Sequence, residues 1–367
     1  MAVGWLGCGP KMKTIMFIAG EASGDAHAAA LIHALGDRAQ TFGAGGPKMQ
    51  AAGMELLLDL TEHAVVGLVE VLKNYGKFKR IFDQLVSEAE KRRPDAVVLV
   101  DFPGFNLRFA AQMKKRGIKV IYYISPQLWA WHARRAKQIE RDVELMLTIF
   151  PFEKDWYATR APRLKVEFVG HPLAERIQES GVRSQNMVLL LPGSREREVA
   201  KIWPVMCGAV DQMPSDVEFV AAAVDERTAV MMRHPRVKVE IGTARDWMRL
   251  AALAITASGT ATMECAFFGC PMIIVYKVNW LTYLIGRLLV KVDWLGMPNV
   301  IAGRRIVTEF IQHEACPCRV AAEAKSLLGD AGKREAMQRE LASVIATLGG
   351  PGASERAARL IFESLPD

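Results

Sequence analysis

Acidic and small polar residues follow the first apolar run of the chain. The segment "FIAGEASGDAHAAALIHAL" (17–35) passes from a buried-strand pattern to an alanine-rich helical pattern, with Glu21, Ser23, Gly24 and Asp25 between them. Two carboxylates would repel a phosphate, so this loop suits sugar hydroxyls, or the proton from one, better than an anion. The simpler alternative is a strand exit followed by a helix that begins near Gly24 and is capped by Ser23.

A carboxylate and two tryptophans follow the next apolar runs. Asp101 stands at the end of "AVVLV", where a general base could reach a substrate, although a turn or helix-cap role also suits that position. The segment "SPQLWAW" contains Trp129 and Trp131. Their flat faces could stack on a sugar or an acyl chain, or they could pack in a core.

Two small-residue loops in the second half of the chain each open a helix. "LLLPGSRERE" and "ASGTATMEC" each place small residues at a helix N-terminus, which suits a diphosphate, and the first loop adds the guanidinium group of Arg195. Glu264, one turn into the second helix, could accept hydrogen bonds from both ribose hydroxyls. Neither a Walker motif nor a complete GxGxxG is present, which argues against ATPases and dehydrogenases. The residues expected to hold the diphosphate in these loops are Gly193, Ser194, Arg195, Ser258, Gly259, Thr260 and Ala261.

Short apolar runs alternate with helical periods along nearly the whole chain, which predicts an α/β protein with two doubly wound parallel sheets in Rossmann-like domains. Ligands bind beyond the carboxyl ends of the strands in such sheets, where the residues above stand. We predict domains at 13–172 and 186–318, a linker within 171–186 and a helical tail over 319–364. The expected strands are 14–20, 96–102, 119–125, 145–150, 166–170, 187–193, 217–223, 237–242, 254–259 and 271–277.

Composition limits the class of protein. The 367 residues are 51% hydrophobic and 24% charged, as in globular proteins, and the net charge of +7 suggests an anionic partner. The basic residues do not form a stripe with aromatics, which argues against a nucleic-acid partner. No apolar run reaches the roughly 18 residues of a spanning helix, and the first 13 residues do not resemble a secretory signal.

The six cysteines are scattered, unlike a disulfide framework or a zinc site. "CPC" at 316–318 could bind a metal, but it lacks a second Cys or His pair nearby. We therefore expect reduced thiols, a cytoplasmic location and no metal or cofactor.

Together these motifs resemble the lipid-A-disaccharide synthase family of B-type glycosyltransferases, from about Thr14 onward. The resemblance rests on "AGEASGD", "GAGGPKM", "VVGLVEVL", "DFPGFN", "SPQLWAW", "PFE", "FVGHP", "LLPGSR", "ASGTATMEC", "PNVIAGR" and "TEFIQ". It implies two domains facing a cleft and a metal-independent, inverting reaction. UDP-2,3-diacylglucosamine would donate its sugar to the 6-hydroxyl of 2,3-diacylglucosamine 1-phosphate (lipid X). The products would be UDP and lipid A disaccharide 1-phosphate.

The resemblance also implies roles for individual residues. Asp101 is the candidate base, with Asp25 and His171 as rivals. The loops of Glu21 and the two tryptophans would meet the sugar and acyl substrate. Arg195 and the second small-residue loop would hold the diphosphate and Glu264 the ribose, while two further residues would complete the nucleotide side or its supporting shell. Those two residues are Asn299 and Gln312.

One departure from the family pattern concerns the loop of Asp101. Many relatives carry a second acid after its proline, where this chain has Gly104. If that second acid is the base in those relatives, it cannot be the base here.

Acylated substrates imply contact with a membrane. As a helix, 65–86 has one face of core type, which carries Val71, Tyr75, Phe78, Phe82 and Leu85. Its second face is apolar and lies beside basic residues, which is typical of interfacial helices on anionic lipid. The alternatives are that another element covers this face, or that Gly67 and Gly76 break the helix. The residues of this second face are Val65, Val66, Val69, Leu72, Lys73, Lys77 and Arg80. A further candidate is "NWLTYLIGRLLVKVDW" (279–294). We expect peripheral association with the cytoplasmic face of the inner membrane.

Three alternatives stay open. A related UDP-sugar transferase or epimerase, such as the enzyme that makes peptidoglycan lipid II, is disfavoured because its family is glycine-rich where this chain has "GEASGD". A non-catalytic UDP-binding or membrane-tethering protein would not need carboxylates at the strand ends. The 319–364 tail could pack across the linker or onto a partner subunit, so a homodimer is possible.

Overall fold

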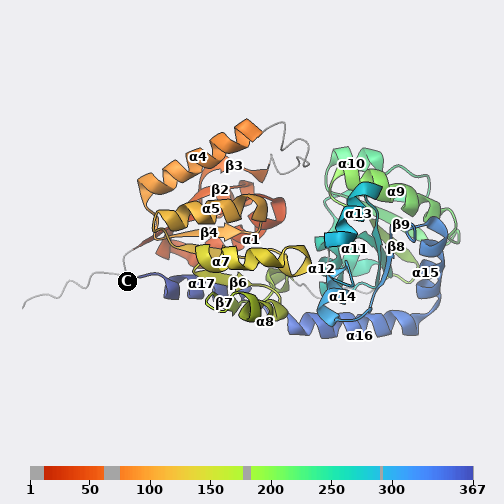
Figure 1. The fold of residues 1–367 in the computed structure, drawn as a ribbon. Helices are drawn as coiled ribbons and strands as arrows, with labels where there is room; N and C mark the ends of the chain where they lie inside the picture. Colours follow the sequence, from red (N-terminus) through yellow and green to blue (C-terminus); the bar gives the residue numbers. More distant parts are fainter. Residues whose placement is uncertain (1–11, 62–74, 177–182, 290–291, 367) are drawn as a thin grey trace, which may run out of the picture. The chain divides into compact units, whose positions relative to one another are not determined.

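The computed structural model describes residues 12–61, 75–176, 183–289 and 292–366. The chain forms two compact units, and each contains one parallel sheet covered by helices (Figure 1). Unit 1 comprises Met1–Pro172 together with Gly350–Asp367, and unit 2 comprises Leu173–Gly349. The expected class, α/β with two parallel sheets, is confirmed.

The sheet of unit 1 has seven strands in the order β3-β2-β1-β4-β5-β6-β7. The strand order reverses at β1, which pairs with β2 on one side and with β4 on the other. In the β1–β4 register Ala19 lies beside Val100, so the loops that follow these two strands begin next to each other. The strands are β1 (Lys13–Ala19), β2 (Ala39–Gly45), β3 (Glu55–Asp59), β4 (Ala96–Val100), β5 (Val120–Tyr123), β6 (Leu145–Thr148) and β7 (Lys165–Phe168).

Helices from both ends of the chain cover this sheet. The last helix, α17, packs against α1 within unit 1. The Arg38 guanidinium lies 4.3 Å from the centre of the Phe362 ring. The helices of unit 1 are α1 (Ala22–Leu35), α2 (Pro47–Ala51), α4 (Tyr75–Arg92), α5 (Pro103–Lys115), α6 (Leu128–Trp131), α7 (Ala136–Asp142), α8 (Pro151–Arg160) and α17 (Ala353–Ser364).

The sheet of unit 2 has six strands in the order β10-β9-β8-β11-β12-β13, and its order reverses between β8 and β11. The strands are β8 (Met187–Leu191), β9 (Glu218–Ala223), β10 (Val237–Ile241), β11 (Leu253–Ala257), β12 (Met272–Tyr276) and β13 (Thr308–Ile311). The helices are α9 (Glu196–Val210), α10 (Glu226–Met231), α11 (Ala244–Leu250), α12 (Thr260–Phe267), α13 (Trp280–Leu289), α14 (Met297–Ala302), α15 (Pro317–Gly329) and α16 (Ala331–Thr347).

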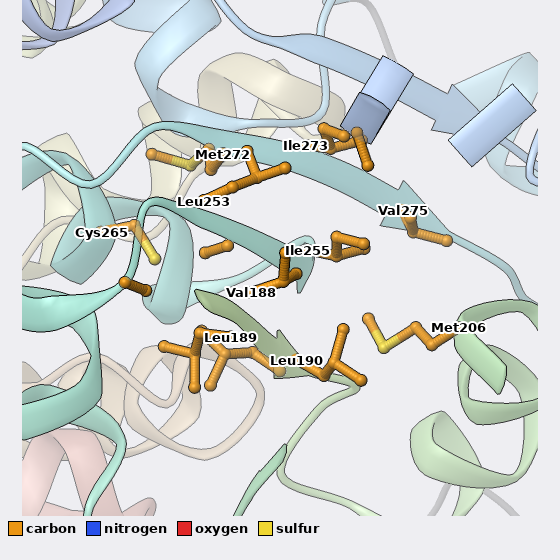
Figure 2. Packing of buried hydrophobic residues seen from close by; sticks show 14 of the residues in the cluster. Val188, Leu189, Leu190, Met206, Leu253, Ile255, Cys265, Met272, Ile273 and Val275 are labelled. Atoms are coloured by element: carbon orange, nitrogen blue, oxygen red, sulfur yellow. The ribbon is translucent and has the colours of Figure 1, made fainter. Parts of the chain in front are cut away.

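The core of unit 2 explains why its strands have continuously apolar sequences. Val188, Ile255 and Ile273 are buried on neighbouring strands, and Met206 of α9 is buried in the same cluster (Figure 2). A strand covered on both faces has no solvent side that would need polar residues. This burial holds β8 and β11 in place, and with them the loops that open α9 and α12.

All ten expected strands are present, but three strands were not predicted. β2 reads "AQTFGAG", whose glycines weaken a strand pattern, and β3 and β13 are short edge strands of five and four residues. The expected cap by Ser23 is wrong: α1 begins at Ala22 with Glu21 as its N-cap residue, so Ser23 lies inside the first turn. The 319–364 segment contains α15 and α16, which belong to unit 2, and α17, which belongs to unit 1.

The helix expected over 65–86 is described only in its second part. α4 runs from Tyr75 to Arg92, and Leu85 is fully buried. Phe82 packs edge-on against the Phe105 and Phe109 rings of α5, at centroid distances of 5.2 and 5.7 Å. The apolar stripe expected on the core side of this helix is therefore confirmed at these two positions.

Candidate active site

Asp101 follows β4 at the point where the strand order of unit 1 reverses. Asp101 and Phe102 both have left-handed backbone conformations, with φ of 46° and 47°. The Asp101 carbonyl accepts hydrogen bonds from Asn106 Nδ2 at 2.8 Å and from the Tyr122 hydroxyl at 2.6 Å. Asn106 and Tyr122 are fully buried, so they hold this unusual turn in place. Backbone strain kept by buried partners is common at functional sites.

The Asp101 carboxyl has a shifted acidity. Burial, and then the negative charge of Glu21, raise its pKa to about 6, against a smaller opposing effect of the hydrogen bond from the Phe102 backbone amide. Near neutral pH this carboxylate is mostly ionised, yet it holds a proton more tightly than an ordinary aspartate does. These are the properties of a general base.

Asp25 is buried on α1, and its carboxylate already has three partners. Oδ1 accepts from the backbone amides of Gly46 at 2.9 Å and Met49 at 3.0 Å, and Oδ2 accepts from Lys48 at 3.1 Å. These amides belong to the loop and first turn of α2. The carboxylate therefore fixes the N-terminus of α2, a structural role that competes with proton transfer.

His171 follows β7 and is also buried. Burial lowers the pKa of its imidazole to about 4, so the ring is neutral at pH 7. Its centroid lies 5.5 Å from that of the Phe150 ring. An imidazole with such a low pKa is a weaker base than the Asp101 carboxylate.

The two tryptophans of "SPQLWAW" differ in their surroundings. Trp129 donates from Nε1 to Glu153 Oε1 at 3.1 Å, whereas Trp131 is 47% exposed. Glu153 is fully buried, and burial raises its pKa to about 8. The structure thus holds Trp129 through a buried carboxyl and leaves Trp131 available to a ligand.

In unit 2, the loop after β8 opens α9, as expected. Gly193 has a φ of 126°, and a Cβ there would lie 2.7 Å from Glu198. Glu198 accepts hydrogen bonds from the Ser194 backbone amide and from Arg195 Nη1, both at 3.3 Å. Only glycine fits this turn, and Glu198 holds the amide and the guanidinium that a diphosphate would use.

The loop after β11 lies beside the loop after β8, because Thr256 of β11 pairs with Leu191 of β8. α12 begins at Thr260 with Gly259 as its N-cap residue, at a φ of 152°. Ser258 donates from Oγ to the Leu295 carbonyl at 3.1 Å. The two expected helix starts therefore meet at the reversal point of one sheet, where α/β proteins bind nucleotides.

Glu264 lies one turn into α12 and is paired with Arg245 of α11. Arg245 donates to Glu264 Oε1 from Nε at 2.9 Å and from Nη2 at 2.6 Å. Because both donors share one oxygen, the guanidinium fixes the direction of the carboxylate.

Asn299 and Gln312 are both buried and bonded within the protein. Asn299 Oδ1 accepts from the backbone amides of Ile306 and Val307, and its Nδ2 donates to Glu309 Oε1 at 2.7 Å. Gln312 forms two hydrogen bonds with the backbone of Val278. These contacts favour the supporting role over direct contact with a nucleotide.

Of the expected membrane-contact residues, Val65, Val66, Val69, Leu72 and Lys73 lie outside the described residues. Lys77 and Arg80 are on α4, and Arg80 is exposed. In the second candidate segment, the α13 residues Trp280 and Leu284 are 66% and 49% exposed.

Across the residues that the structure describes, no helix is both long and apolar enough to cross a membrane. Nor does this part of the chain contain a group of three or more His, Cys, Asp or Glu side chains that could hold a metal ion.

Several residues that organise these loops were not found from the sequence. Arg245, Asn106, Tyr122, Glu198 and Glu153 act through contacts with other elements, which no local motif announces. One signal was available: Asn106 closes the motif "DFPGFN".

Comparison with known proteins identifies the family. The family described as "Lipid-A-disaccharide synthetase" matches residues 15–361. A lipid-A-disaccharide synthase of Geobacter sulfurreducens is 40% identical over 374 residues, which cover 96% of this chain and 97% of that protein. A lipid-A-disaccharide synthase of Syntrophus aciditrophicus is 39% identical, with 94% and 96% covered.

Solved structures share the fold at low sequence identity. A UDP-GlcNAc 2-epimerase of Neisseria meningitidis bound to UDP-GlcNAc matches with a TM-score of 0.67 and 13% identity, over 96% of this chain and all of that one. MurG of Acinetobacter baumannii matches with a TM-score of 0.56 and 13% identity, over 96% and 99%. The fold is that of B-type glycosyltransferases, as expected, and the sequence matches show that the chain belongs to the lipid-A-disaccharide synthase family.

Proposed function

We propose that this chain is an inverting glycosyltransferase that makes lipid A disaccharide 1-phosphate. The donor is UDP-2,3-diacylglucosamine, the acceptor is 2,3-diacylglucosamine 1-phosphate, and UDP is released. Membership of the lipid-A-disaccharide synthase family supports the reaction. The UDP-GlcNAc bound in the epimerase structure supports a UDP-sugar donor on this fold.

We assign the acceptor side to the first domain (13–172) and the UDP-sugar side to the second (186–318). Asp101 takes the proton from the 6-hydroxyl of the acceptor, whose oxygen attacks the anomeric carbon while the bond to UDP breaks. Inversion needs one such base. The single observation that carries this assignment is the raised pKa of Asp101 in a turn that Asn106 and Tyr122 hold.

The departing UDP carries the developing negative charge. We assign its stabilisation to backbone amides at the starts of α9 and α12 together with Arg195, without a metal ion. When the diphosphate arrives, it replaces Glu198 as the partner of Arg195 and of the Ser194 amide. Glu264 accepts hydrogen bonds from the ribose hydroxyls.

The test is UDP release from the donor, with and without acceptor, by wild type and Asp101→Asn. Release that depends on the acceptor and falls at least about a hundredfold in the variant, while UDP binding stays intact, supports reaction and base together. Asp37→Asn, an exposed acid of the same unit, is the matched control. Release that survives Asp101→Asn moves the base to another residue, and no release by wild type overturns the proposed reaction.

We also propose that the enzyme binds the cytoplasmic face of the inner membrane through its exposed apolar residues. Trp280 and Leu284 of α13 are exposed, with the exposed, basic Arg287 one turn further on. Replacing Trp280 and Leu284 by Ala should reduce sedimentation of the protein with phosphatidylglycerol vesicles at low salt. Val230→Ala, which removes a side chain that is 59% exposed on α10, is the control. Equal sedimentation of both variants would contradict a role for α13.

A further inference from the structure

Two cysteines lie in contact at the start of α15, apart from the residues assigned to the glycosyl transfer. Cys316 is the N-cap residue of this 13-residue helix and Cys318 lies in its first turn. Their sulfur atoms are 3.0 Å apart, and both are free thiols. Cys318 is exposed and Cys316 partly exposed, whereas Cys265 and Cys270 of the same unit are buried. The pair is therefore open to reagents from solution.

The surroundings make the two thiols unequal. The hydrogen bond from Cys318, and then the backbone amide and charge of Arg319, lower the pKa of the Cys316 thiol. The pKa of Cys318 is raised, mainly because its proton is shared with Cys316. The positive end of the α15 dipole acts in the same direction on Cys316. Cys316 is thus the thiol that ionises first.

The proline between them holds the pair in place. Pro317 packs on α9 so closely that a Cβ added to Gly208 would lie 2.8 Å from Pro317 Cγ. The backbone between the two cysteines is therefore anchored, and both side chains stay at the same helix end. Closing a disulfide requires the sulfurs to approach by only about 1 Å, from 3.0 Å to bond length.

We propose that Cys316 and Cys318 form a redox-active dithiol that exchanges with small disulfides. The Cys316 thiolate attacks one sulfur of the disulfide RS–SR, which forms a Cys316–SR mixed disulfide and releases RS⁻. Cys318 then loses its proton and attacks Cys316 Sγ, which forms the Cys316–Cys318 bond and releases the second RS⁻. The two cysteines are oxidised and one external disulfide is reduced to two thiols.

Oxidised glutathione, added to the folded full-length chain at neutral pH, tests this assignment. Mass spectrometry of the peptide that contains both residues should show loss of two hydrogens in wild type, without a retained adduct. Cys318→Ser should stop at a glutathionyl group on Cys316. Cys316→Ser should likewise stop at a single glutathionyl group, on Cys318. Cys207→Ser, which removes a partly buried thiol of the same unit, should oxidise like wild type.

Two results would overturn the proposal. One is a wild-type chain that keeps glutathionyl groups on both cysteines and never forms the internal bond. The other is a Cys318→Ser chain that takes up no glutathionyl group on Cys316, which would mean that Cys316 does not attack an external disulfide. Serine is a good N-cap residue, so Cys316→Ser should keep α15 folded, and thermal unfolding checks this. The result does not depend on the proposed glycosyl transfer, because no substrate is present.

Discussion

Arg245 directs two hydrogen bonds at a single oxygen of Glu264, which joins the first turn of α11 to α12. The carboxylate is thereby oriented before any nucleotide binds. In the proposed site, a carboxylate that is already oriented would lose less freedom on accepting the ribose hydroxyls.

We predict that Arg245→Met weakens UDP binding about tenfold, which corresponds to about 1.4 kcal/mol. The loss of affinity should be smaller for 2′-deoxy-UDP, because that ligand lacks one of the two ribose hydroxyls that would donate to Glu264. Titration calorimetry with both ligands measures the two changes.

The matched control is Arg227→Met, which breaks the Arg227–Asp225 pair on the surface of the same unit, at 3.1 Å. It should leave both affinities unchanged. Equal losses of UDP and 2′-deoxy-UDP binding in Arg245→Met would show that Arg245 acts on another part of the nucleotide.

The acid limb of the pH profile should identify the base. If Asp101 takes the proton, kcat/KM rises with pH through an apparent pKa near 6, the value that burial and the charge of Glu21 give this carboxyl. Glu21→Gln removes the negative charge beside Asp101, which lowers the pKa of the Asp101 carboxyl. The acid limb should therefore move to lower pH. Glu88→Gln removes an acid that pairs with Arg92 on α4 and is not among the causes of the shifted pKa of Asp101, so it should not move the limb. A limb near 4 would instead indicate His171.

Replacing Asp25 should destabilise the protein more than replacing Asp101 does. Asp25→Ala leaves three backbone amides of the α2 loop without their acceptor and should lower the free energy of unfolding by about 2–4 kcal/mol. Asp101→Asn, whose carbonyl contacts involve only the backbone, should stay within about 1 kcal/mol of wild type. Urea unfolding measures both. A stable Asp25→Asn protein without activity would make Asp25 the base.

Glu153 should make stability fall as pH rises. Its pKa is about 8 in the folded chain, above the ordinary 4.5, because burial disfavours the charged form. The folded state thus binds the proton of Glu153 more tightly than the unfolded state does. The stabilisation that this gives is complete below pH 4.5 and is lost as pH rises through 8. Between these values it lowers the free energy of unfolding by about 1.4 kcal/mol per pH unit.

Glu153→Gln replaces the titrating carboxyl group by a neutral amide. The dependence of the free energy of unfolding on pH should therefore become flatter. Denaturation of both proteins between pH 5 and 9 isolates the effect, since every other titrating group is shared. Parallel curves for the two proteins would mean that Glu153 is ionised in the folded chain at neutral pH.

The strands and the reactive loops could be read from the sequence because they depend on local pattern. A strand buried on both faces has a continuous apolar run, and the residue after it must stand at the carboxyl edge of the sheet, as Asp101 and Ser258 do. β2 was missed because glycine replaces the β-branched residues of a strand, which permits close approach to β1. A Cβ on Gly43 would lie 2.0 Å from the Phe17 carbonyl oxygen.

The roles within the loops could not be read in the same way, because they depend on contacts between distant residues. Asp25 and Asp101 are similar in sequence context, and only the amides of residues 46–49 show that Asp25 fixes α2. Arg245 lies 19 residues from Glu264, a spacing with no periodic meaning. A side chain that acts through a partner is visible only once both elements are packed.

The place of α17 in unit 1 has a consequence for how the chain is made. A ribosome synthesises residues up to 172 first, then all of unit 2, and only afterwards the helix that covers α1. Until α17 is synthesised, part of the apolar surface of unit 1 stays exposed to water. Unit 2 is complete earlier and can fold before synthesis ends. Arg356, whose Nε donates to the Val169 carbonyl at 2.7 Å, joins the first part of the late segment to the end of the early one. Chaperones that shield nascent chains would therefore meet the N-terminal half of this enzyme for the longest time.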